Sequence, residues 1–227
     1  MLALTPSHGF AQTSTEQIWV DVLLDWMFKQ KQLLELEIGP KALIGEGEVW
    51  QELTVTPAYE YYPNKRWDLV SRVLFSWVRQ TVELSTFEVR PIIGFRYYLT
   101  PTQTGRWLCR DFNRVEMRMI YYREVDQWET TYRYRNRLEF QYAFNNPSLT
   151  NDRTTYGLAD AEIFINLGSA AEERFNDNWR FRVGAGYRHT YAWRTEFLYV
   201  LQLSRNTLGQ EFDVSNHIFR FRIKRFF

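Results

Sequence analysis

Serine and histidine are the residues of this sequence that could support nucleophilic chemistry. Ser215 and His217 lie two positions apart, and Ser204 comes shortly before them. A serine hydroxyl becomes a nucleophile when a histidine within hydrogen-bond reach accepts its proton. Ser215 and His217 are therefore the candidate catalytic residues of a lipid hydrolase. The alternative interpretation is that His189 and His217 lie at the ends of strands and have no chemical role.

Carboxylates form a second group that could do chemistry. Asp160, Glu162 and Glu196 are expected to face the same side as Arg180 and Arg182. Neighbouring carboxylates could form an acid-protease-like site or bind a metal, but no histidine joins them at a ligand spacing. We interpret them as partners of the arginines in ion pairs, and we predict neither a metal site nor any other cofactor.

Arginine and glutamate alternate with apolar residues through much of the second half of the chain. The predicted charge ladder consists of Arg114, Glu116, Arg118, Arg133, Arg135, Arg137, Glu139, Asp160, Glu162, Arg180, Arg182, Arg188, Glu196, Arg220, Arg222 and Lys224. A ring of cations can attract and select anions. Alternatively, cations and carboxylates pair with each other and simply fill an interior. The sequence favours ion-paired filling and leaves the selective pore open.

Composition excludes several other classes of protein. The chain has 227 residues and a net charge of +1, so bulk charge gives no reason to expect nucleic acid as a partner. The single cysteine, Cys109, excludes an internal disulfide and a multi-cysteine metal site. No run of about 18 apolar residues is present, which excludes a membrane-spanning helix.

The elements that must position these residues alternate apolar and polar side chains with a period of two. Such alternation is typical of strands. Turn-forming or charged clusters separate the alternating runs. Eleven runs are apparent, at 20–28, 34–38, 53–61, 67–77, 87–99, 115–121, 132–144, 159–167, 179–187, 197–203 and 219–227.

Run length and aromatic content distinguish a membrane barrel from a soluble sheet protein. Many of the runs approach the length of about 9–11 residues that a tilted strand needs to cross a bilayer, whereas strands of soluble proteins average about 5–6 residues. Aromatic residues make up 18% of the chain and gather at the ends of runs, as in interfacial girdles.

We predict an all-β, closed, antiparallel up-and-down transmembrane barrel with the apolar face toward lipid. Because single-chain bacterial barrels normally have an even number of strands, we expect 10 or 12. A soluble β-protein, the alternative, would stay in solution without detergent.

The two ends of the chain suggest export. Residues 1–15 are interpreted as a remnant signal peptide or a disordered N-terminus, with cleavage near Ala11 or Gln12. Residues 16–227 then form a single barrel. The last strand carries a predicted targeting signal, which implies recognition by the barrel assembly machinery. Arg225 departs from this pattern, because it falls on the apolar face, where a rim position would let its head group snorkel. The signal residues are Phe219, Phe221, Ile223 and Phe227.

Several runs, taken in order, carry a resemblance to a known family. They are Trp19 within 17–20, Glu-Met-Arg at 116–118, the arginine-rich run 132–140, then 161–164, 175–187 and the terminal Phe227. Their order resembles the outer-membrane barrel family catalogued as domain of unknown function 2490, which is common in Bacteroidetes-type bacteria. The likeness covers residues 16–227. It implies an outer-membrane location and brings no catalytic residues, because the activity of the family is unassigned.

The resulting expectation is a non-enzymatic barrel of the bacterial outer membrane. It would act as a narrow channel or as a structural or binding component with a lumen lined by Arg and Glu. The alternative is a barrel enzyme that acts on lipid or envelope substrates. The expected surroundings are the outer-membrane bilayer, and the oligomeric state stays open.

Overall fold

The computed structural model describes residues 15–45, 49–80, 85–100, 105–167, 178–205 and 212–227, and the predicted N-terminal signal therefore lies largely outside the described residues. Its strands are β1 (Thr15–Lys29), β2 (Gln32–Ile44), β3 (Gln51–Tyr61), β4 (Trp67–Arg79), β5 (Ser85–Tyr98), β6 (Trp107–Tyr122), β7 (Gln127–Ala143), β8 (Thr154–Leu167), β9 (Asn178–Thr190), β10 (Trp193–Arg205) and β11 (Phe212–Phe226). Within these ranges no helix is long and apolar enough to cross a membrane.

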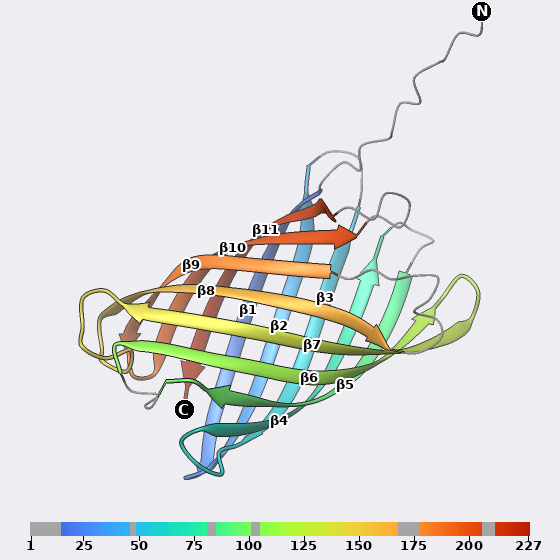
Figure 1. The fold of residues 1–227 in the computed structure, drawn as a ribbon. Coiled ribbons are helices and arrows are strands. Elements are labelled where there is room, and N and C mark those ends of the chain that lie inside the picture. Colours follow the sequence, from blue (N-terminus) through green and yellow to red (C-terminus); the bar gives the residue numbers. More distant parts are fainter. Residues whose placement is uncertain (1–14, 46–48, 81–84, 101–104, 168–177, 206–211) are drawn as a thin grey trace, which may run out of the picture.

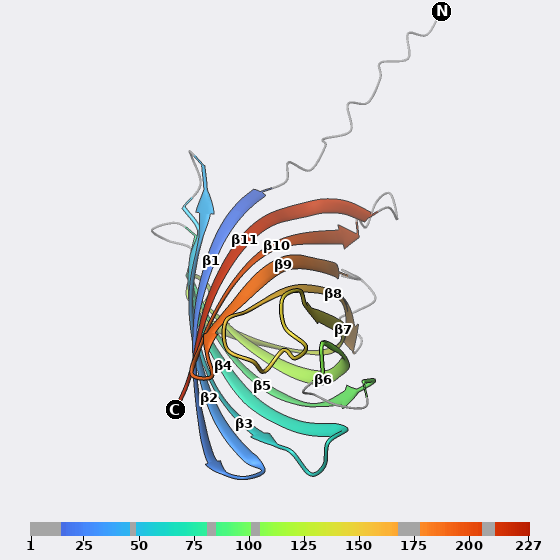
Figure 2. The same cartoon turned by 90° about the vertical axis from the view of Figure 1, so that its left-hand side faces the viewer.

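The strands close into one barrel (Figure 1). Each strand pairs antiparallel with the next one along the chain, from β1 with β2 to β10 with β11. The first and last strands then pair in parallel, with Thr15 opposite Asn216 and Asp25 opposite Phe226. We call this β1–β11 pairing the seam. Figures 1 and 2 both place β1 beside β11.

Two details of the expected fold are wrong. The described chain forms 11 strands, not 10 or 12, and the barrel is not antiparallel throughout. Each of the eleven alternating runs does correspond to a strand, and the error came from parity alone. In an up-and-down order, an odd number of strands leaves the first and last running the same way, and a parallel ladder can still close the sheet. The start of β1 and the end of β11 consequently lie at opposite ends of the barrel (Figure 1).

The two faces of the wall have the predicted polarity. Side chains of successive residues in a strand point to opposite faces. On the outer face Ile93 is 72% exposed and Val183 is 58% exposed, whereas inside the barrel Glu116 and Glu162 are 0% exposed. Aromatic side chains contact each other across neighbouring strands near the ends of the wall, as Trp67 does with Tyr97.

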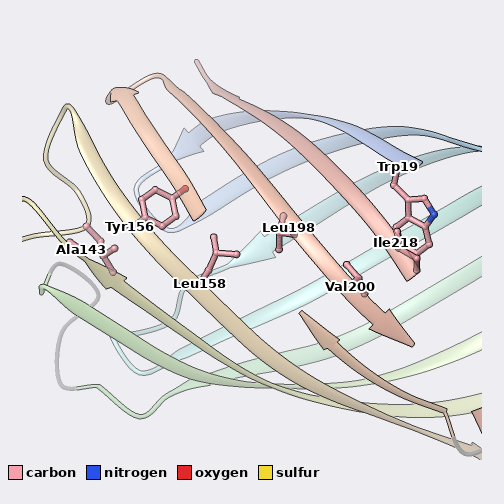
Figure 3. Packing of buried hydrophobic residues seen from close by; sticks show 8 residues of the cluster. Trp19, Ala143, Tyr156, Leu158, Leu198, Val200 and Ile218 are labelled. Atoms are coloured by element: carbon pink, nitrogen blue, oxygen red, sulfur yellow. The ribbon is translucent and has the colours of Figure 1, made fainter. Parts of the chain in front are cut away.

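An apolar strip lines part of the interior on β8, β10 and β11, although the sequence predicts a lumen lined by Arg and Glu (Figure 3). Leu158, Leu198 and Val200 lie between Tyr156 near one end of the strip and Trp19 with Ile218 near the other. Leu149, in the connection from β7 to β8, belongs to the same cluster and is only 7% exposed. This connection therefore inserts a side chain into one end of the barrel.

Two glycines of β9 give neighbouring groups the space they need. A Cβ at Gly184 would lie 2.1 Å from the carbonyl oxygen of Phe197 on β10, and a Cβ at Gly186 would lie 2.3 Å from the ring of Tyr156. The interior bulk of Tyr156 thus depends on the missing side chain of Gly186.

Candidate functional site

The interior of the barrel is the candidate functional site. It contains a cavity of about 440 Å³, whose lining includes fourteen Lys and Arg side chains and seven carboxylates. A barrel of this size has an interior that side chains largely fill. Most of the predicted charge ladder borders this cavity, including Arg114, Glu116, Glu139, Asp160 and Arg180.

Glu162 lies at the centre of the densest region of the network. Its carboxylate oxygens lie 2.5 Å from Arg114, 2.8 Å from Arg135 and 2.8 Å from Arg182. Arg182 also pairs with Asp160 at 2.5 Å. One fully buried carboxylate therefore holds guanidinium groups from β6, β7 and β9.

Glu116, on β6, has the same role as Glu162. It contacts Arg133 at 2.5 Å, Arg135 at 2.7 Å and Arg114 at 3.2 Å. Because Arg114 and Arg135 contact both carboxylates, Glu116 and Glu162 form one continuous cluster. Charge-assisted hydrogen bonds of this kind are the strong ones, and they suit a site shielded from water.

The remaining ladder residues form smaller groups. Glu139 pairs with Arg110 and Arg137. Glu196 accepts hydrogen bonds from Arg222 at 3.0 Å and from Tyr156 at 2.8 Å, so it lies apart from Asp160 and Glu162.

Three ladder cations have other surroundings. Arg118 pairs with Glu88 at 2.8 Å. Arg188 is 3% exposed, beside the inward glycine pair of β9. Arg180 donates to the neutral amide of Gln202 at 2.7 Å, and none of the described carboxylates lies within ion-pairing distance of it. Arg180 is thus a cavity-lining cation whose charge is not matched by a contacting carboxylate.

A second network, on the first half of the chain, is absent from the predicted ladder. Arg96 contacts Glu60 at 2.6 Å and Asp68 at 3.4 Å, and Arg72 links Glu60 to Glu35. Glu35 and Asp25 both pair with Lys224 of the last strand. In the first runs of the sequence, these acids and arginines occupy the polar positions of the alternation, as the ladder residues do in the later runs. This alternation is the sequence signal that could have predicted the second network.

Three interior aromatic rings are also missing from the predicted site. The guanidinium carbons of Arg133, Arg135 and Arg180 lie 5.0, 4.2 and 5.0 Å from the ring centre of Phe164. Phe112 has three arginines around it in the same way, and Trp19 has two arginines and a lysine. An aromatic face attracts cations and lets like charges gather around it. The sequence contains a signal for two of these rings. Phe112 and Phe164 occupy positions of their strands at which the alternation places inward-facing, polar residues, so both rings are expected to face the interior.

Ser215 and His217 lie on β11 beside β10. The hydroxyl of Ser215 donates to the backbone carbonyl of Gln202 at 3.1 Å, and Nδ1 of His217 lies 2.6 Å from the hydroxyl of Tyr199. Each group therefore has a hydrogen-bond partner other than its supposed catalytic partner.

The residues of the predicted C-terminal signal face outward. Phe219 and Phe221 are 37% and 39% exposed, and Ile223 has the same phase. The ring of Phe227 stacks on Trp26 at 5.2 Å. Arg225 is on the outer face too, close to the end of the strand, where its guanidinium lies over the rings of Trp193 and Phe227.

The comparison with protein families identifies the chain. Residues 16–213 match the family described as protein of unknown function DUF2490. The chain belongs to this family. The match extends from β1 into the first residues of β11, so it covers nearly the whole barrel and confirms the resemblance drawn from the order of its motifs. No curated protein and no solved structure matches the chain, and the family brings no assigned activity.

Proposed function

We propose that this DUF2490 member is a non-enzymatic β-barrel of the bacterial outer membrane, whose interior forms a narrow passage or binding chamber for small anions. The observation that carries the proposal is a closed barrel with an apolar outer face and a cation-rich cavity of about 440 Å³.

The outer face supports a membrane location. The strands are 11 to 17 residues long, and about 9–11 residues at a tilt are enough to cross the hydrocarbon core. The exposed apolar side chains form a belt around the wall, whereas soluble monomers seldom expose contiguous apolar patches of more than a few hundred Å².

The inner face supports anions as the solute. Fourteen Lys and Arg side chains line the cavity against seven carboxylates, so the cavity surface is mainly cationic. Arg180 adds a charge that no contacting carboxylate among the described residues offsets. A lumen with one dominant sign of charge favours solutes of the opposite sign.

Planar-bilayer conductance of the purified, refolded protein tests the proposal. In a KCl gradient we expect a small, steady current whose reversal potential indicates preference for chloride. Replacing the cavity residue in R180Q should reduce this preference, whereas R79Q, at the outer rim of β4, should not. A folded barrel that carries no current would exclude the passage and leave only the binding chamber.

The surroundings of Ser215 and His217 give the alternative enzyme no support. We expect the wild-type chain and an S215A/H217A variant to release the same small amount of fatty acid from phospholipid vesicles. Hydrolysis that the wild type performs and the variant does not would reverse this assignment.

We further propose that the outward Phe219, Phe221, Ile223 and Phe227 present the last strand to the barrel assembly machinery. The exposed rings of Phe219 and Phe221 support this. An F219A/F221A variant should reach the outer membrane in smaller amounts while it still refolds in detergent.

A further inference from the structure

The outer face of the barrel has a polar interruption halfway along β6 and β7. Asp111 and Asn113 of β6 alternate with inward Phe112 and Arg114, so they point outward. Asn136 lies opposite Asn113, on β7. Away from the strand ends, the other described outward positions are apolar or small or carry a hydroxyl or a histidine ring, and Asp111 is the charged one.

These outward side chains form a small hydrogen-bonded group, which we call the belt cluster and define as Asp111, Asn113, Tyr134 and Asn136. The amide of Asn136 donates to Asp111 at 2.7 Å and to Asn113 at 3.0 Å. Asn113 donates to Asp111 at 2.5 Å, and the hydroxyl of Tyr134 donates to Asn113.

The belt cluster lies between the two ends of the apolar belt. On the outer face of β6, Trp107 and Tyr121 mark the two ends, and on β7 Tyr142 and Trp128 do so. Asn136 lies about halfway between Trp128 and Tyr142 along β7. If the barrel spans a membrane, as proposed above, the belt cluster is at the depth of the hydrocarbon core, where no lipid group can hydrogen-bond to it.

The internal hydrogen bonds leave the belt cluster incomplete. Both N–H groups of Asn136 are used, but no donor among the described residues reaches its carbonyl oxygen. Asn113 uses one of its two N–H groups, and the carboxylate of Asp111 has lone pairs to spare. Polar groups left unpaired in hydrocarbon are costly, and charged ones mark functional contacts.

We propose that the belt cluster is a lateral contact between two copies of this barrel, arranged around a two-fold axis along the membrane normal. Two copies inserted in the same direction place identical residues at identical depth. The spare N–H of Asn113 in one copy can then meet the carbonyl oxygen of Asn136 in the other, and the reciprocal bond forms by symmetry. The contact needs no other protein to supply polar groups at this depth.

The neighbouring strand lets the two walls approach closely. On the outer face of β8, the small residues Ala159 and Ala161 lie opposite Phe140 and Leu138 of β7. Small residues beside hydrogen-bonding side chains are typical of protein contacts within membranes. The contact thus runs over β6, β7 and β8.

Cys109 provides a reporter, because it is on the outer face two residues from Asp111. The test uses the full chain, refolded into phosphatidylcholine vesicles at a low ratio of protein to lipid, and treated with a short bismaleimide. We expect a covalent dimer through Cys109. The matched control carries C109S and V22C, which moves the thiol to β1 on the opposite side of the barrel, and it should remain monomeric.

The polar contact is tested by an N113A/N136A variant that keeps Cys109. Its cross-linked fraction should fall by about tenfold, the order expected when hydrogen bonds across a membrane contact are lost. S71A removes a different outward polar group, on β4, and should leave the fraction unchanged. A shift of SDS-gel mobility on heating shows which variants are folded.

Flotation of the vesicles separates two kinds of failure. A chain that does not float with lipid overturns both the membrane location and the dimer. If the barrel is folded and inserted, three results would contradict the dimer alone. In the first, Cys109 cross-links no better than the V22C control, and in the second, N113A/N136A cross-links like the wild type. The third result is that Cys109 cross-links to another protein in cell envelopes.

Discussion

At the scale of single residues, shared carboxylates hold the interior together. Glu162 accepts from three arginines on three strands. Each charge pays a desolvation cost when it is buried, and only several well-placed partners can offset that cost. A carboxylate with three partners is therefore the residue whose loss leaves the most charge uncompensated.

Replacing Glu162 with glutamine tests this. E162Q keeps the shape of the side chain but leaves Arg114, Arg135 and Arg182 without their common counter-charge, so we expect the free energy of unfolding to fall by about 3–5 kcal/mol. Urea unfolding in lipid vesicles, followed by tryptophan fluorescence, measures it. E16Q removes an exposed carboxylate near the start of β1 and should change stability by less than about 0.5 kcal/mol. Equal effects of the two variants would show that the Glu162 cluster is not a stabilising centre.

At the scale of strands, the seam is the feature that distinguishes this barrel. Eleven residue pairs form a parallel ladder between β1 and β11, and this ladder removes the two open edges that an unclosed sheet would expose. In the middle of the seam the outward side chains are apolar, as at Val22 and Ile223, whereas Glu16, His217 and Arg225 lie toward its ends.

A disulfide can test the seam directly. Val22 is opposite Ile223, and neighbouring strands lie about 4.8 Å apart, within the range of about 4.4–6.8 Å between Cα atoms that a disulfide accepts. In a C109S background, V22C/I223C should form a disulfide on mild oxidation. The disulfide is detected as a change of mobility on an SDS gel that a reductant reverses. I18C/I223C places the thiols four residues out of register and should not react. The opposite result would mean that the barrel closes differently.

Close approach between β9 and β10 gives another test. A methyl group in G184A would lie 2.1 Å from a backbone oxygen of β10, and relieving such a clash in a packed wall costs about 1–3 kcal/mol. We expect a lower yield of heat-modifiable, folded protein. A185L enlarges the next residue, on the open outer face, and should fold like the wild type. Normal folding of G184A would show that the wall has more freedom here than the structure indicates.

The sequence predicted the strands well because alternation is a local property. All eleven runs are strands, and Arg133 and Arg182, on the polar positions of their runs, border the cavity. Closure itself was predicted, but the parallel pairing of β1 with β11 was not, because the even strand number normal in bacterial barrels was given more weight than the eleven runs in the sequence. The partners of individual charges were equally hidden: that Lys224 meets Glu35 depends on the register of the seam. Asp111 was missed although its phase shows it facing outward.

At the scale of the whole molecule, the barrel is polar inside and apolar outside. Its interior has both a cavity and an apolar strip that reaches Leu149 in the connection from β7 to β8. Conduction would therefore have to pass beside this strip, along the charged wall, which fits a narrow passage.

The positions of the two chain ends give a prediction about topology. An epitope inserted just before β1 and another placed after Phe227 should lie on opposite sides of the membrane, since the seam is parallel. In intact cells an antibody or an added protease should therefore reach one epitope and not the other, and permeabilised cells should expose both. Labelling of both epitopes in intact cells would contradict the parallel seam.

The seam also determines the stage of folding at which the barrel can close. Thr15 donates a hydrogen bond to Asn216, a residue 201 positions further along the chain. Each hairpin is local and can form early, but contacts between such distant segments are the slow ones in folding. Until β11 arrives, β1 keeps an unpaired edge that invites aggregation. We therefore expect the chain to depend on protection of its first strand until β11 pairs with it, and to acquire its resistance to protease and denaturant in one late step.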